Sequence, residues 1–78
     1  MKWIEMENRA WVNSDHIESL HITSKNSKML IMACTHSQSE YTIATYTTEA
    51  QARECINSLI SQIADGKTYT IRATVNEN

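Results

Sequence analysis

The side chains best suited to metal chemistry are three histidines and two cysteines: His16, His21, His36, Cys34 and Cys55. Cys34 and His36 are two residues apart, so on a strand they would point to the same side, and a helical Cys55 above them would supply a third ligand of a tetrahedral zinc site. The spacing matches neither of the paired patterns, C-x2-C and H-x3-H, that zinc sites use. Because free cysteines are among the most buried residue types, we interpret both thiols as small core side chains and predict no metal and no cofactor.

Residues for catalysis are equally sparse. A nucleophilic triad needs a serine or cysteine beside a histidine that a carboxylate orients. Asp15 and His16 are neighbours, but adjacency in sequence does not aim the imidazole at a nucleophile, and Asp15 is better explained as a turn former. The single glycine, Gly66, cannot build a phosphate-binding loop. No spacing suited to a general acid and base pair is found among the carboxylates Glu5, Glu7, Glu18, Glu40, Glu49, Glu54 and Asp65. We therefore predict a chain that is not an enzyme.

The aromatic side chains have two interpretations. They could stack single-stranded nucleic acid on a sheet face, although few cations lie between them. If the tryptophans are exposed, protein recognition is the better interpretation, because Trp and Tyr dominate interface hot spots. If they are buried, they fill the core and the sheet edge. The candidate protein-interaction residues are Trp3, Trp11, Leu30, Met32, Tyr41 and Tyr46.

One amphipathic helix is predicted over about residues 48–65. Apolar side chains recur there at steps of three and four residues, at Ala52, Cys55, Ile56, Leu59, Ile60 and Ile63. Thr48 and Gln51 have the spacing of a capping box, in which each side chain bonds the other's free backbone N–H. Gly66 stands where a helix commonly ends on a left-handed residue. We expect the whole apolar stripe to face the core.

The rest of the chain is predicted to form short strands. Alternating apolar and polar residues, or β-branched and aromatic ones, are separated by clusters of turn-forming residues. The strands are expected at 2–6, 10–13, 17–23, 29–35 and 41–46, with a short closing strand at 68–73 and a frayed end at 75–78. The fold class that follows is α+β, with an antiparallel meander sheet of about five strands packed on the one helix, as a single compact domain of residues 1–78.

Two motifs carry a resemblance. The first is Trp11-Val12-Asn13 followed by Asp15 and Ile17, and the second is Tyr46 followed by Thr48-Glu49-Ala50 at the start of the helix. Together they resemble small single-domain proteins of phages, prophages and Gram-positive bacteria, whose function is uncharacterised. The resemblance covers about residues 11–66 and departs in that Glu49 and Ala50 are contiguous here, while the first hairpin has no clear counterpart. It implies a sheet with one helix and implies no activity.

Charge and composition exclude several classes of protein. The formal net charge is −2, from seven basic and nine acidic residues spread along 78 positions, so no basic stripe is available for phosphates or an anionic membrane. Nucleic-acid binding is disfavoured. No apolar run approaches the roughly 20 residues of a spanning helix, and the N-terminus lacks a signal-peptide core. We expect a cytoplasmic protein.

The predicted central strand suggests a homodimer. Its two faces are both apolar: Met29, Ile31 and Ala33 on one, Leu30, Met32 and Cys34 on the other. One helix of about 17 residues covers one face of a sheet. The other face must be covered by strong sheet curvature, by the N-terminal hairpin or by a second copy, and we predict a two-fold dimer.

The functional hypothesis is a non-enzymatic module that binds a protein target and is encoded by a phage or mobile element. It would act as a stoichiometric inhibitor of the anti-CRISPR or anti-defence type or as an adaptor. The alternatives are a housekeeping or structural homodimer and a single-stranded nucleic-acid binder.

Overall fold

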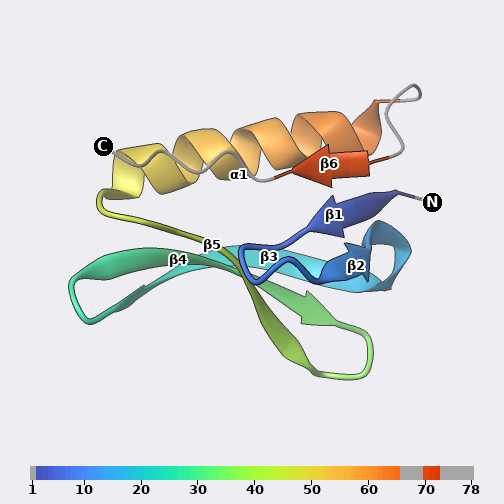
Figure 1. Cartoon of the computed structure of the whole chain (residues 1–78), viewed down its shortest axis with the longest axis horizontal. Helices are drawn as coiled ribbons and strands as arrows, with labels where there is room; N and C mark the ends of the chain where they lie inside the picture. Colours follow the sequence, from blue (N-terminus) through green and yellow to red (C-terminus); the bar gives the residue numbers. More distant parts are fainter. Residues whose placement is uncertain (1, 66–69, 73–78) are drawn as a thin grey trace.

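The computed structural model describes residues 2–65 and 70–72 and has the predicted α+β architecture (Figure 1). In chain order its elements are β1 (Trp3–Glu5), β2 (Trp11–Asn13), the 3-10 turn η1 (Ser14–His16), β3 (Ile17–Lys25), β4 (Lys28–Thr35), β5 (Glu40–Tyr46), α1 (Glu49–Ala64) and β6 (Thr70–Arg72). Each predicted strand from the N-terminus to β5 is present within two residues of its expected bounds. Of the predicted closing strand, Thr70–Arg72 is described, and the remaining positions lie outside the described residues.

The strands form two sheets instead of one continuous meander. The first sheet is antiparallel in the order β3-β4-β5, and the second has the order β2-β1-β6, with β6 parallel to β1. The break lies at Asn13, whose side-chain oxygen accepts the Asp15 N–H at 2.9 Å and caps η1. This turn redirects the chain between β2 and β3, so β3 begins a new sheet instead of extending the first hairpin.

The β3–β4 hairpin closes on a two-residue turn. Asn26 and Ser27 have φ angles of 52° and 65°, and Lys25 pairs with Lys28. Positive φ at both central residues defines a type I′ turn, whose twist matches that of the two strands. Tight closure brings β3 and β4 into a continuous register from the Lys25–Lys28 pair to the Ser19–Cys34 pair, beyond which a bulge shifts the pairing.

A bulge in β5 decides which of its side chains face the core. Ile31 pairs with Ala44 and Met32 with Thr42, so Ile43 is an extra residue in β5. A bulge shifts the alternation of side chains by one position. As a result Ile43 and Ala44 are both fully buried, and the Ile43 carbonyl accepts the Glu7 N–H at 2.8 Å, which ties the end of the first hairpin to β5.

Helix α1 packs against all three strands of the β3-β4-β5 sheet. Thr48 is its N-cap, as predicted, and accepts the Gln51 N–H at 3.2 Å; the Gln51 side chain accepts from Thr47 instead of bonding back to Thr48. The helix ends at Ala64, and the predicted stop at Gly66 lies outside the described residues. The core between helix and sheets consists of Ile4, Met6, Val12, Ile31, Ala33, Ile43, Ala44, Tyr46, Ala52, Cys55 and Leu59.

The prediction for Ile60 is wrong. Ile60 is 53% exposed, whereas Ala52, Cys55 and Leu59 are buried. Successive residues of an α-helix are about 100° apart, so Ile60 is rotated far from the line that Leu59 directs at the sheet. The apolar stripe that contacts the core is therefore narrower than the sequence pattern suggests.

Candidate protein-interaction site

The outer face of the β1–β2 hairpin carries two exposed tryptophans. Ile4 and Val12 pair across the hairpin and are buried, so their neighbours project to the opposite face. There Trp3 pairs with Asn13 and Trp11 with Glu5, and the two indoles are 41% and 43% exposed. Trp3 and Trp11 are diagonal neighbours in this register, a separation that large aromatic side chains can span. We call this surface, formed by Trp3, Trp11, Glu5 and Asn13, the tryptophan face.

The second candidate surface is the outer face of the β3-β4-β5 sheet. Leu30, Met32 and Cys34 of β4 lie on it and are each half-buried, while Ile31 and Ala33 point into the core. Their cross-strand neighbours are polar: Ser19, His21 and Thr23 on β3, and Glu40, Thr42 and Thr45 on β5. The Thr42 hydroxyl even donates to the Met32 sulfur, at 3.4 Å. These flanking side chains cover part of the apolar strip and leave its three side chains half-buried.

The two candidate tyrosines have different environments. Tyr41 is 41% exposed, whereas Tyr46 is buried and pairs with Met29 on the core side of the sheet. Tyr46 therefore cannot contact a partner, which corrects its assignment as an interaction residue. Burial and, to a smaller extent, the neighbouring Cys55 thiol raise the pKa of Tyr46 well above its usual value of 10.0. Tyr46 points inward because the β5 bulge shifts the alternation of side chains, so that Tyr46 and Ala44 both face the core.

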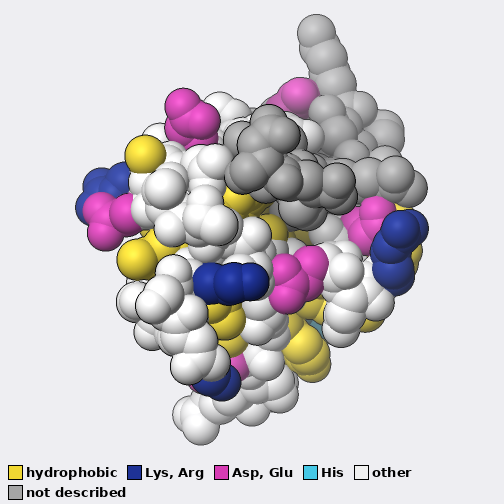
Figure 2. Space-filling model, turned by 60° about the vertical axis from the view of Figure 1, so that its left-hand side comes forward, with side chains coloured by type: hydrophobic (Ala, Val, Ile, Leu, Met, Phe, Trp, Pro, Cys, Tyr) yellow, Lys and Arg dark blue, Asp and Glu magenta, His cyan; other side chains and the backbone are white. Residues whose placement is uncertain are grey.

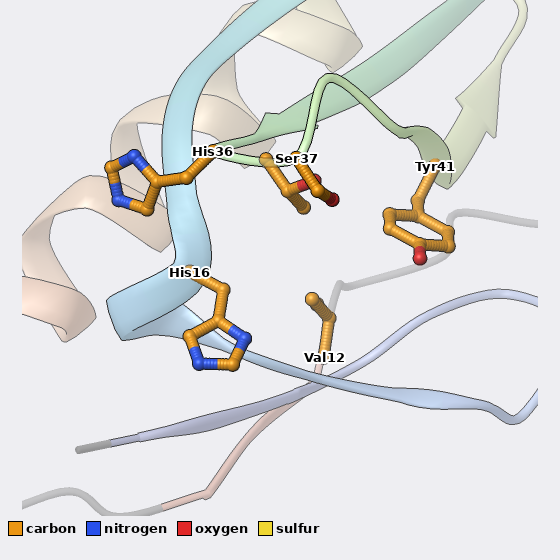
Figure 3. A pocket seen from close by; sticks show the side chains of 6 residues that line it. Val12, His16, His36, Ser37 and Tyr41 are labelled. Carbon is orange, nitrogen blue, oxygen red and sulfur yellow. The ribbon is translucent and has the colours of Figure 1, made fainter.

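A pocket of about 280 Å³ opens where η1, β2 and the β4–β5 turn meet, lined by Val12, His16, Thr35, His36, Ser37 and Tyr41. The His36 N–H donates to the His16 carbonyl at 3.1 Å, which holds the two turns together. In the close view the His16 and Tyr41 rings stand on opposite sides of the hollow, with Ser37 above Val12 (Figure 3). The sequence pattern did not predict this site, because its residues come from three strands and two turns that are separate in the sequence.

Hydrogen bonds in the pocket do not form a catalytic relay. The Ser37 hydroxyl is within hydrogen-bond distance of the Thr35 and Ser39 hydroxyls, at 3.0 and 3.4 Å. The His36 ring turns away from Ser37 (Figure 3), and its Nδ1 lies 3.2 Å from the Glu18 carboxylate. A base must reach its nucleophile within about 3.2 Å. The pocket thus offers polar atoms to a small ligand, with no serine activated by a histidine among the described residues.

The possible metal ligands are separated by the sheet. Cys34 lies on the outer face of β4, and Cys55 is buried beneath the inner face, so the two thiols cannot share an ion. His36 and His21 each lie near a carboxylate, Glu18 at 3.2 Å and Glu40 at 4.0 Å. Within residues 2–65 and 70–72, no three groups of the metal-ligating kind come together.

Charged side chains are dispersed on the face shown in Figure 2, where lysines and arginines stand apart and alternate with acidic groups. The described part of the chain contains no helix with both the length and the apolar character needed to cross a lipid bilayer.

No protein-family model, curated protein or solved structure matches the chain.

Proposed function

We propose that the chain is a non-enzymatic module that binds another protein through the tryptophan face. The observation that carries this proposal is the exposure of Trp3 and Trp11 on one side of a hairpin whose other side is fixed in the core. Hot spots of protein interfaces are enriched in tryptophan, and a rigid strand pair presents the indoles at little conformational cost. A tryptophan that served only the core would turn inward with Ile4 and Val12.

A protein partner explains this surface better than nucleic acid. Across the β1–β2 pair the residues directly opposite the two indoles are Glu5 and Asn13, neither of which is a cation, and the Arg72 position of β6 is paired with the acidic Glu5. The net charge of the chain is −2, and the basic side chains visible in Figure 2 are separated by acidic ones. A basic groove normally accompanies aromatic stacking in binders of single strands.

The resemblance to small phage and Gram-positive bacterial proteins supports a specific version of the proposal. Such a chain would act by occupying a surface of a host protein, as a stoichiometric inhibitor of a defence system or as an adaptor. Neither role requires a catalytic group. The alternative is a housekeeping or structural homodimer, supported by the apolar strip of Leu30, Met32 and Cys34 on the outer sheet face.

The test compares two sets of variants of the whole chain in pull-downs from bacterial lysate at physiological salt. Replacing Trp3 and Trp11 by threonine removes the indoles but keeps residues suited to strands. Ile60→Ala, which removes an exposed apolar side chain on α1, is the matched control. We expect wild type and Ile60→Ala to retain the same partner and the double variant to bind it at least about tenfold more weakly, because a hot-spot residue contributes about 2 kcal/mol or more.

Two results would contradict this function. One is repeated failure of the wild-type chain to retain any specific partner. The other is undiminished binding by a folded Trp3→Thr, Trp11→Thr variant, which would exclude the tryptophan face. Salt-sensitive binding of a labelled oligonucleotide by the wild-type chain would favour the nucleic-acid alternative instead.

A further inference from the structure

Strand β3 is the outer strand of its sheet, and one edge of it is open. β4 pairs along one side of β3. On the other side, within the described part of the chain, no other element forms a backbone hydrogen bond with residues 18–25. Natural edge strands are usually blocked by charges, bulges or short length. Here the middle of the edge, residues 20–24, contains no Lys, Arg, Asp or Glu and no bulge.

The turn between β3 and β4 reveals which backbone groups face this edge. A type I′ turn closes with a hydrogen bond between its first and last residues, so the pair of Lys25 and Lys28 is hydrogen-bonded. Hydrogen-bonded residues alternate along an antiparallel strand. Thr23 and His21 therefore bond to β4, while Ser24, Ile22 and Leu20 direct their N–H and C=O groups away from the sheet.

We propose that these outward groups pair with the same strand of a second copy, antiparallel and about a two-fold axis at Ile22. In this register Leu20 lies opposite Ser24 of the second copy, and Ile22 lies opposite its equivalent. At each of these positions the two facing residues exchange two backbone hydrogen bonds, each from the N–H of one residue to the C=O of the other. The half-buried side chains of Leu20 and Ile22 gain apolar cover from the second copy on the core side of the joined sheet.

The ends of β3 are complementary in charge. In the same register Lys25 lies opposite Ser19 of the second copy, next to Glu18 of that copy. Both charges are exposed in the single chain, and Glu18 forms the bulge at the start of the paired region. An antiparallel partner with the same sequence thus brings a cation to an anion at both ends, whereas parallel pairing would set Lys25 against Lys25.

The opposite edge of the sheet explains why the assembly stops at two copies. β5 is interrupted by its bulge at Ile43, and the Ile43 carbonyl already accepts the Glu7 N–H. A sheet with one open edge can join to a second copy once, which gives a closed two-fold dimer and not a filament. This inference goes beyond the proposed function, because it uses β3 and leaves the tryptophan face free.

The experiment measures the mass of the whole chain by light scattering behind a sizing column at tens of micromolar. We expect wild type at twice 8.9 kDa. Ser24→Pro removes an outward N–H only, so it should return the mass to one chain and keep the circular dichroism spectrum. Thr23→Pro is the matched control, because it removes an N–H that bonds β4, and it should destabilise the single chain itself.

Amide hydrogen exchange of the wild-type chain gives a second measurement that does not depend on the folding of a variant. We expect the amides of Leu20, Ile22 and Ser24 to become protected as concentration rises. A wild-type mass of one chain with these amides unprotected overturns the proposal. It is also overturned if Ser24→Pro remains dimeric while Met32→Glu dissociates, which would place the interface on the outer face of the sheet.

Discussion

The ammonium of Lys2, near the N-terminus, donates a hydrogen bond to the backbone carbonyl of Gln62 in the last turn of α1. It also donates to the carbonyl of Asp65, the C-cap residue, and the Lys2 residue is only 9% exposed. The last turn of α1 has no basic residue of its own. Lys2 therefore supplies the positive charge that the C-terminal end of a helix favours, and it joins the first strand to the helix.

Replacing Lys2 by methionine should destabilise the fold by about 1 to 2 kcal/mol, because the helix loses a favourable charge and two carbonyls lose a donor. Methionine keeps an unbranched apolar stem, so packing changes little. Urea denaturation followed by circular dichroism measures the free energy of unfolding. An unchanged midpoint would show that water replaces the ammonium at no cost.

Leu59 and Ile60 are neighbours of the same size with opposite environments. Leu59 is fully buried against the sheet, so Leu59→Ala should cost about 2 to 5 kcal/mol through lost contacts and a cavity. Ile60→Ala, at an exposed position, should change stability by less than about 0.5 kcal/mol. Thermal melting of the two variants compares them directly. Similar melting temperatures would mean that the orientation of α1 is different from the one described.

Ser27 occupies a backbone conformation that suits glycine. Its φ of 65° lies in the left-handed region, where a side chain costs roughly 1 kcal/mol. Ser27→Gly creates the Asn-Gly pair preferred in type I′ turns and should raise the free energy of unfolding by up to about 1 kcal/mol. Asn26→Gly serves as the comparison and should gain less, because asparagine tolerates this region better than serine. A loss of stability in Ser27→Gly would argue against the I′ turn.

Local patterns in the sequence were sufficient to place the helix and five strands. The spacing of Ala52, Cys55 and Leu59, together with the Thr48 cap, depends on contacts within a few residues, and the structure confirms it. Alternation marked β3 and β5, and a continuous apolar run marked β4. These signals arise from the backbone period of each element, so they can be read without knowing what each element packs against.

Features that depend on distant contacts could not be predicted in the same way. The extra residue Ile43 reverses the facing of Tyr46, yet strict alternation is what the sequence of β5 suggests. The second sheet is completed by the parallel pairing of β1 with β6, between opposite ends of the chain, which no local pattern reveals. The pocket between His16 and Tyr41 likewise joins strands and turns whose proximity is set by the tertiary fold.

The hydroxyl of Tyr46 is buried beside the Cys55 thiol and makes no hydrogen bond of normal geometry within the described residues. A buried polar group without a partner carries a desolvation cost, so Tyr46→Phe should stabilise the fold at neutral pH by up to about 1 kcal/mol. Chemical denaturation at pH 7 measures this difference. A destabilisation of more than 1 kcal/mol would instead indicate that the hydroxyl makes a favourable contact with the adjacent Cys55 thiol.

Tyr46 should also make the fold sensitive to alkaline pH. Burial, followed by the effect of Cys55, raises the pKa of Tyr46 in the folded chain above the usual value of 10.0. Below pH 10 the phenol is protonated in both the folded and the unfolded chain, so the difference between the two pKa values does not change the free energy of unfolding. Above pH 10 the unfolded chain releases the proton while the folded chain keeps it, so the free energy of unfolding should fall by about 1.4 kcal/mol per pH unit. Denaturation midpoints of wild type and Tyr46→Phe should diverge steadily from pH 10 upward, whereas parallel midpoints would show that the buried phenol ionises as readily as an exposed one.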